Sequence, residues 1–139
     1  MVERGAGGAG ELEGLLEGLR SLSGEITTAA VLSGNGDLRA STVPPGVDQE
    51  RYGAMLAALV GLTRRTVQES GKDGFSQARI GVEGRHVLLV GLTGGGTLAA
   101  TTGADARVGL VLYDMRNARS ELERVLGSGE ATTGEGGRG

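Results

Sequence analysis

Three consecutive glycines, Gly94–Gly96, are the feature of this chain closest to a nucleotide-binding motif. A phosphate-binding loop needs a Lys-Ser/Thr pair after its glycines and then a helix, whose first N–H groups hold the phosphates. Here the glycines are followed by Thr97–Ala100, a run typical of a strand. No G-x-G-x-x-G motif opens a helix after a strand either. The glycines therefore predict a hairpin turn, and we expect no nucleotide cofactor.

His86 is the only histidine, and the chain has no cysteine, so the usual zinc ligands are missing. As a general base, His86 would need a serine nucleophile and an orienting carboxylate, and no G-x-S-x-G motif is present. Three isolated carboxylates stand in turns or on a helix, without the close pairing of a glycosidase site: Asp73, Glu83 and Asp114. These patterns predict no catalytic residues, no metal and no cofactor.

Composition narrows the class further. The chain has 139 residues and a net charge of −3, which allows one domain and argues against a nucleic-acid module with a basic surface. The pair Arg64-Arg65 is too short for a nucleic-acid patch. No apolar run approaches the ~18 residues of a membrane span, and the N-terminus lacks the apolar region of a signal peptide. We expect a cytoplasmic protein without membrane insertion.

The elements that position these residues lie between two glycine-rich ends. Residues 1–10 and 127–139 contain almost no large apolar side chains and are predicted to be flexible tails, because burial cannot repay the entropy of ordering them. The folded domain is expected over residues 11–126. Its patterns predict, in order, a helix, two strands, a long helix, three strands and a last helix: Glu11–Leu22, Ile26–Leu32, Leu38–Thr42, Asp48–Ser70, Phe75–Val82, Val87–Leu92, Thr97–Thr102 and a helix from near Asp105. Asn35-Gly36 favours a two-residue hairpin turn, and Asp48 is a good N-cap.

The long middle helix has no charged residue from Tyr52 to Thr63. Its large side chains fall on one half, which we expect to pack on the protein's own sheet: Tyr52, Met55, Leu56, Leu59, Val60, Leu62 and Val67. The other half carries a stripe of small residues: Gly53, Ala54, Ala57, Ala58 and Gly61. A helix that is apolar all round is usually buried, so a second copy packed antiparallel about a two-fold axis is one explanation. An alanine-rich solvent face is the other, although the two glycines favour the interface.

The strand Phe75–Val82 offers a second route to pairing. If it lies at the edge of the sheet, its backbone groups are free to pair with a second copy, with Phe75, Gln77 and Arg79 at the contact. An ordinary edge protected by Gln77 and Arg79 is the alternative.

Four segments together resemble the Roadblock family of dynein light chains and their bacterial relatives. They are AAVLSGNGDLRAS (Ala29–Ser41), the acidic-capped helix from Asp48, VEGRHVLLVGL (Val82–Leu92) and GADARVGLVLYDMRNARSEL (Gly103–Leu122). The last segment is most similar to the bacterial branch, which includes MglB-like proteins and Roadblock proteins of actinobacterial GTPase operons. The resemblance covers about residues 11–126.

The resemblance implies an α+β fold, a three-layer α-β-α sandwich around a five-stranded antiparallel sheet, profilin-like, with the middle helix on one face. It also implies a homodimer through the middle helices and third strands, and a non-enzymatic partner of a small Ras-like GTPase. MglB-like dimers stimulate GTP hydrolysis by repositioning the GTPase's own residues, so no catalytic residue is carried over. The family pattern does not determine the contact surface, for which we select Arg51, Arg64, Arg65 and Gln68 on the middle helix.

Two other functions stay open at this point. A structural adaptor could join larger assemblies without touching the nucleotide state of any GTPase. An enzyme would need a deep polar pocket with perturbed titratable groups that no motif reveals.

Overall fold

The computed structural model describes residues 2–43, 48–69 and 75–127. The elements follow the expected order, α-β-β-α-β-β-β-α: α1 (Val2–Leu22), β1 (Ile26–Leu32), β2 (Leu38–Ser41), α2 (Gln49–Glu69), β3 (Gln77–Val82), β4 (Arg85–Gly91), β5 (Thr97–Gly103) and α3 (Val108–Asn117). A turn at Ala118 separates α3 from a further helical segment over residues 119–127, so the expected last helix is two pieces. Asp48 is confirmed as the N-cap of α2, because its carboxylate accepts the Arg51 N–H at 3.1 Å.

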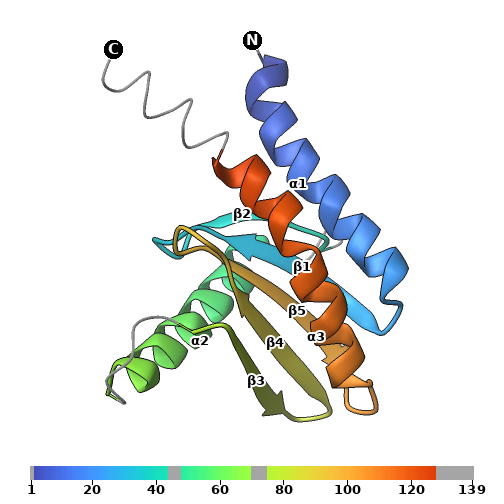
Figure 1. The fold of residues 1–139 in the computed structure, drawn as a ribbon, viewed down its shortest axis with the longest axis vertical. Helices are drawn as coiled ribbons and strands as arrows, with labels where there is room; N and C mark the ends of the chain where they lie inside the picture. Colours follow the sequence, from blue (N-terminus) through green and yellow to red (C-terminus); the bar gives the residue numbers. More distant parts are fainter. Residues whose placement is uncertain (1, 44–47, 70–74, 128–139) are drawn as a thin grey trace.

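The five strands form one antiparallel sheet in the order β2-β1-β5-β4-β3. Helix α2 covers one face, and α1 and α3 lie side by side on the other (Figure 1). The three-layer sandwich is therefore confirmed, and β3 is an edge strand as the pairing hypothesis requires. A continuously apolar run such as Val87–Leu92 is typical of a central strand, but β5 occupies the centre of the sheet. Its neighbour β4 is nevertheless covered on both faces, because Val87, Leu88, Leu89 and Val90 are all buried.

Alternation along the strands builds a separate apolar core on each face of the sheet. Leu88 and Val90 of β4 join the core under α1 and α3, which also holds Leu12, Leu16 and Met115. Val87 and Leu89 join the smaller core under α2, together with Ala30, Leu32, Leu56, Val60 and Ala99. Continuously apolar strands allow this arrangement because successive side chains point to opposite faces.

The glycine-rich segments between strands are hairpin loops. Gly94 and Gly95 have φ angles of 94° and 98°, and the Leu92 N–H donates to the Gly96 carbonyl at 2.9 Å. Both glycines thus supply the positive φ that closes the turn, and no helix N-terminus follows them. The first hairpin differs from the expected two-residue turn: only Gly36 has positive φ, and the Ser33 N–H donates to Asp37 O across a three-residue loop.

The structure describes most of the predicted N-terminal tail but only the first residue of the predicted C-terminal one. Helix α1 begins at Val2 rather than near Glu11, so residues 2–10 are helical; extending an existing helix is much easier than nucleating one. Their mobility stays a prediction. Gly127 ends the described chain, and the rest of the expected C-terminal tail lies outside the described residues.

Glu123 ties the last helical segment to the β4–β5 hairpin. Its carboxylate accepts the Thr93 N–H at 2.7 Å and lies 3.3 Å from the Arg119 guanidinium. The Thr93 backbone hydrogen bond, with help from Arg119, holds the pKa of Glu123 below its ordinary value, against the opposing effect of partial burial.

We expect this contact to stabilise the fold above the ordinary carboxyl pKa and to fade as pH falls. The pKa is lower in the folded state, so the unfolded chain takes up the proton first and acid favours unfolding. Urea unfolding of the wild type and Glu123→Gln, at about pH 7 and about pH 3, measures the effect. The stability advantage of the wild type should shrink at the lower pH; an unchanged difference would contradict the assignment.

Candidate interaction surface

Helix α2 turns a narrow face towards the sheet. Its fully buried residues are Gly53, Leu56 and Val60. A Cβ atom at Gly53 would lie 3.2 Å from the Leu38 side chain of β2, so the missing side chain lets this helix approach its own sheet. Ala57 lies beside the first hairpin, 3.5 Å from where a Cβ of Gly36 would stand. Gly53 and Ala57, placed on the small outward stripe by the sequence, therefore face the protein itself.

The outward face of α2 carries the other three residues of the small stripe together with one large residue, Leu62. Ala54, Ala58 and Gly61 are exposed, and Leu62 beside them is 58% exposed instead of packing on the sheet. We call these four residues the outer strip. Met55 borders the strip and is also exposed, whereas Leu56 and Val60 are buried as expected. The helical period predicts which residues share a face, but the shape of the sheet decides which face turns inward.

The edge strand β3 alternates between the two faces of the sheet. Ala78 and Ile80 pack partly on the core under α2, while Gln77 and Arg79 are exposed. Gln77 accepts a hydrogen bond from the Arg116 guanidinium at 2.6 Å. Phe75 precedes the strand and is half-buried against the same core as Ala78. Strand β3 pairs with β4 alone among the described strands, so its other edge is open.

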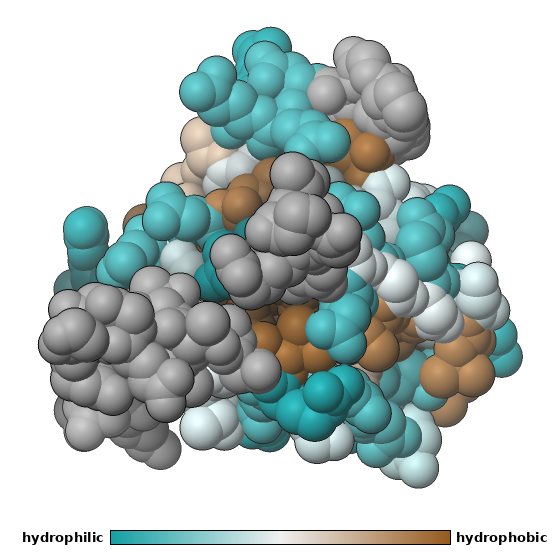
Figure 2. All heavy atoms as spheres, turned by 90° about the horizontal axis from the view of Figure 1, so that it is seen from above, coloured by the Kyte–Doolittle hydropathy of each residue, from teal (hydrophilic) through white to brown (hydrophobic). Residues whose placement is uncertain are grey.

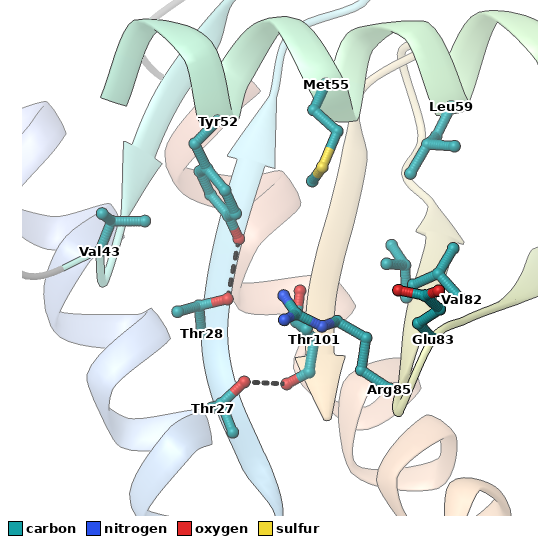
Figure 3. A pocket seen from close by; sticks show the side chains of 11 residues that line it. Thr27, Thr28, Val43, Tyr52, Met55, Leu59, Val82, Glu83, Arg85 and Thr101 are labelled. Atoms are coloured by element: carbon teal, nitrogen blue, oxygen red, sulfur yellow. Dashed lines mark hydrogen bonds between the residues drawn. The ribbon is translucent and has the colours of Figure 1, made fainter. Parts of the chain in front are cut away.

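A hollow of about 580 Å³ opens between α2 and the sheet, next to the outer strip. Tyr52, Met55 and Leu59 point into it from α2, and three threonines line it from the strands: Thr27, Thr28 and Thr101 (Figure 3). The Tyr52 and Thr28 hydroxyls share a hydrogen bond of 3.0 Å, and the Thr27 hydroxyl donates to Thr101 O at 2.9 Å. Val82, Glu83 and Arg85 also line it, from the end of β3 to the start of β4.

The chemistry of this hollow favours contact over catalysis. Tyr52 engages Thr28, and Thr27 donates to a main-chain carbonyl, so neither threonine has a general base beside it. The hollow is otherwise largely apolar. Sequence reasoning missed this hollow, because its walls come from segments that lie far apart in the chain, between Thr27 and Thr101. Adjacent Thr27 and Thr28, beside a register shift in β1, are a local trace of it.

Arg64 lies where its helix position predicts but is engaged within the chain. Its guanidinium donates to the Gly34 carbonyl at 3.2 Å and to the Gly95 carbonyl. It therefore joins α2 to both hairpin loops and is not free for a partner in this state. Arg51, Arg65 and Gln68, the other three residues selected for partner contact, are exposed.

His86 and the isolated carboxylates are not brought together. The His86 Nε2 atom is 3.1 Å from the Ala104 carbonyl, and its Nδ1 is buried without a hydrogen-bond partner. Glu83 lines the hollow and Asp114 lies on α3, while Asp73 lies outside the described residues. Within the described ranges, no three His, Asp or Glu side chains are placed to hold a metal ion.

A family model for the Roadblock/LC7 domain matches residues 12–102. The chain belongs to the Roadblock/LC7 family. A 101-residue stretch is 34% identical to the uncharacterized protein MJ0714 of Methanocaldococcus jannaschii, covering 73% of this chain and 85% of that protein. The family-model match runs from Leu12 of α1 into β5 and therefore includes the outer strip and the edge strand.

Solved structures share the Roadblock/LC7 fold. Myxococcus xanthus MglB superposes with a TM-score of 0.73 at 15% identity, covering 85% of this chain and 89% of that one. A Roadblock/LC7 domain from Streptomyces avermitilis superposes with a TM-score of 0.70 at 21% identity, covering 82% of this chain and 96% of that one. Acanthamoeba castellanii profilin IB superposes with a TM-score of 0.57 at 14% identity, covering 80% of this chain and 95% of that one. This similarity confirms the profilin-like architecture.

One face of this Roadblock/LC7 protein mixes hydrophobic and hydrophilic residues. In the view of Figure 2, hydrophobic residues reach the surface in patches set among hydrophilic ones. None of the helices in the described part of the chain combines the length and hydrophobicity needed to span a bilayer.

Proposed function

We propose that this protein is a non-enzymatic homodimer that binds a small Ras-like GTPase and changes its nucleotide turnover. The observation that carries the proposal is the outer strip of α2 beside the open edge of β3. Both surfaces expose groups that proteins usually cover, namely Leu62 and unpaired main-chain N–H and C=O groups. A second copy related by a two-fold axis covers both at once.

Small residues on the strip support a close helix–helix contact. A Cβ atom at Gly61 would meet nothing within 4 Å, so another backbone has room to approach there. The adjoining hollow offers space for side chains of the second copy, because Met55 lies on both the strip's border and the hollow's wall. Strand pairing through β3 would join the two sheets across the axis.

Charges at the ends of the strip favour an antiparallel arrangement. Arg51 and Glu69 are separated by five helical turns and therefore lie on the same side of α2 as the strip, one at each end. Antiparallel packing centred near Val60 brings Arg51 against Glu69 of the second copy. A parallel arrangement would bring like charges together.

The GTPase half of the proposal rests on the resemblance to MglB-like proteins and on the paired α2 helices. The dimer would present two copies of Arg65 and Gln68 side by side on one surface, next to the hairpin loops that Arg64 secures. An adaptor without effect on nucleotide state is the second candidate, favoured by the same apolar surface.

Calorimetry with a purified small Ras-like GTPase from the same organism tests the proposal. We expect affinities for the GTP-analogue and GDP states that differ about tenfold or more, because a ligand shifts two states only by its differential affinity. Arg65→Glu should slow association, since exposed charges act mainly on the on-rate. Because Arg65 follows the outer strip by one helical turn, light scattering should first show the same oligomeric state for this variant as for the wild type. Arg20→Glu, on the opposite face of the sheet, is the matched control and should leave association unchanged. Equal affinities for the GTP-analogue and GDP states would favour the adaptor function instead. The absence of any binding would contradict the proposal that a GTPase is the partner.

A further inference from the structure

Six large hydrophobic side chains are exposed in the described chain, and they divide between two faces of the sandwich. Met55, Leu62 and Val82 belong to the α2 side, where the proposed dimer contact or the hollow involves them. The other three lie in the layer of α1 and α3: Leu22, Leu110 and Tyr113, with exposed fractions of 71%, 55% and 57%. A dimer built on α2 and β3 leaves that second layer uncovered, because it lies across the sheet (Figure 1).

A groove of about 260 Å³ runs between α1 and α3 in this layer. Its apolar walls come from Leu15, Leu19 and Leu22, and small residues keep it open: Gly14, Gly18 and Ala118. A Cβ atom at Gly14 or Gly18 would meet no heavy atom within 4 Å. Each glycine costs the helix about 1 kcal/mol relative to alanine, so α1 gives up intrinsic stability at the two positions that border the groove.

The charged residues that line the groove are all acidic. Asp114 and Glu121 stand along α3 and the segment that follows it, and no lysine, arginine or histidine lines the groove. Glu121 pairs with Arg124 at 2.8 Å, whereas the carboxylate of the half-buried Asp114 has no hydrogen bond or ion pair with the described residues. Glu11 lies close enough to Arg124 to help raise the pKa of that guanidinium, which places another carboxylate near this end of the groove.

We propose that the α1–α3 groove docks a basic amphipathic helix of a partner protein. Apolar side chains of that helix would fill the space above Gly14 and Gly18 and cover Leu22, while a lysine or arginine on its flank would pair with Asp114. A helix suits a groove between two helices, which offers no free sheet edge for strand addition. The chain's own residues 128–139 do not fit as the occupant: they hold two glutamates, one arginine and no apolar side chain larger than alanine. The site is separate from the α2 surface and does not depend on the proposed GTPase partner.

A fluorescent amphipathic peptide of leucine and lysine, and its counterpart of leucine and glutamate, test this site by fluorescence polarisation with the full chain. The basic peptide should bind, and the acidic one should bind at least about tenfold more weakly. Gly18→Leu places a large side chain in the groove, where its Cβ atom meets no other heavy atom within 4 Å, and replaces a poor helix former by a good one. The variant should therefore fold normally but bind the basic peptide about tenfold or more weakly than the wild type. Asp114→Asn should weaken binding and reduce its salt dependence.

Leu62→Glu, on the α2 side, is the control and should bind the basic peptide as the wild type does. NMR shifts on titration should concentrate on α1 and α3. The proposal is overturned if the basic peptide does not bind the wild type, or if the acidic peptide binds the wild type equally well. It is also overturned if Gly18→Leu binds the basic peptide as tightly as the wild type does, or if the NMR shifts map to α2.

Discussion

Replacing Leu62 by glutamate is expected to convert the proposed dimer to monomers. Leu62 is the large side chain of the outer strip, and its strip neighbours Ala58 and Gly61 offer no group to pair with a carboxylate. The exposed Arg65, three residues on, offsets part of the cost of a carboxylate at position 62. An uncompensated charge buried in a contact costs about 3–5 kcal/mol, and the two-fold axis would bury two of them. Since 1.4 kcal/mol corresponds to about a tenfold change in affinity, the dissociation constant should rise more than about a hundredfold.

Light scattering and sedimentation at tens of micromolar protein measure this change. Leu110→Glu is a matched control, because Leu110 is exposed to 55% against 58% for Leu62 but lies on the other face of the sheet. The control should remain a dimer and should fold as the wild type does. A monomeric wild type, or equal behaviour of the two variants, would show that the outer strip is not the contact.

Truncating Leu56 to alanine should produce the largest loss of stability among the α2 substitutions considered. Leu56 is fully buried, and its neighbours on the sheet include Ala30 and Ala99, whose short side chains cannot move in to fill the space. A buried Leu→Ala change costs about 2–5 kcal/mol, and sites that collapse poorly lie towards the upper end. We therefore expect the free energy of unfolding to fall by several kcal/mol.

Urea unfolding at one fixed protein concentration checks this expectation, because the proposed dimer would make the apparent stability depend on concentration. Leu22→Ala removes the same atoms from a side chain that is 71% exposed and should change the free energy of unfolding by less than about 0.5 kcal/mol. A loss at Leu56 no greater than at Leu22 would mean that α2 does not rest on the sheet through this residue.

Several features could be predicted from local sequence because their causes are local. The continuous apolar run of β4 predicts burial on both faces, and Asp48 predicts the start of α2 through its own carboxylate. Gly94 and Gly95 predict a turn since glycine readily adopts positive φ. The order of the elements and the Roadblock resemblance follow from such patterns, and the family match and the fold confirm both.

The candidate surface was only half predictable. Of the five residues in the predicted small stripe, Ala54, Ala58 and Gly61 share the outward face of α2, whereas Gly53 and Ala57 face the protein itself. Leu62, predicted to pack on the sheet, lies on the outward face instead. A wheel gives the angles between residues of one helix, and it contains no information on where the sheet lies. The sheet face under α2 includes Leu38 of β2, which meets Gly53 at the first turns of the helix.

By itself, then, the sequence determined the periods, the glycine turn before β5 and the cap of α2, because each depends on residues that are neighbours along the chain. The tertiary structure alone decided which side of α2 faces water, how Arg64 reaches two loops some 30 residues away, and how α1 and α3 enclose an acidic groove. Those outcomes depend on the shapes of elements that meet only after folding. Local propensity cannot encode them, since the energy of each contact is set by a partner from a distant part of the chain.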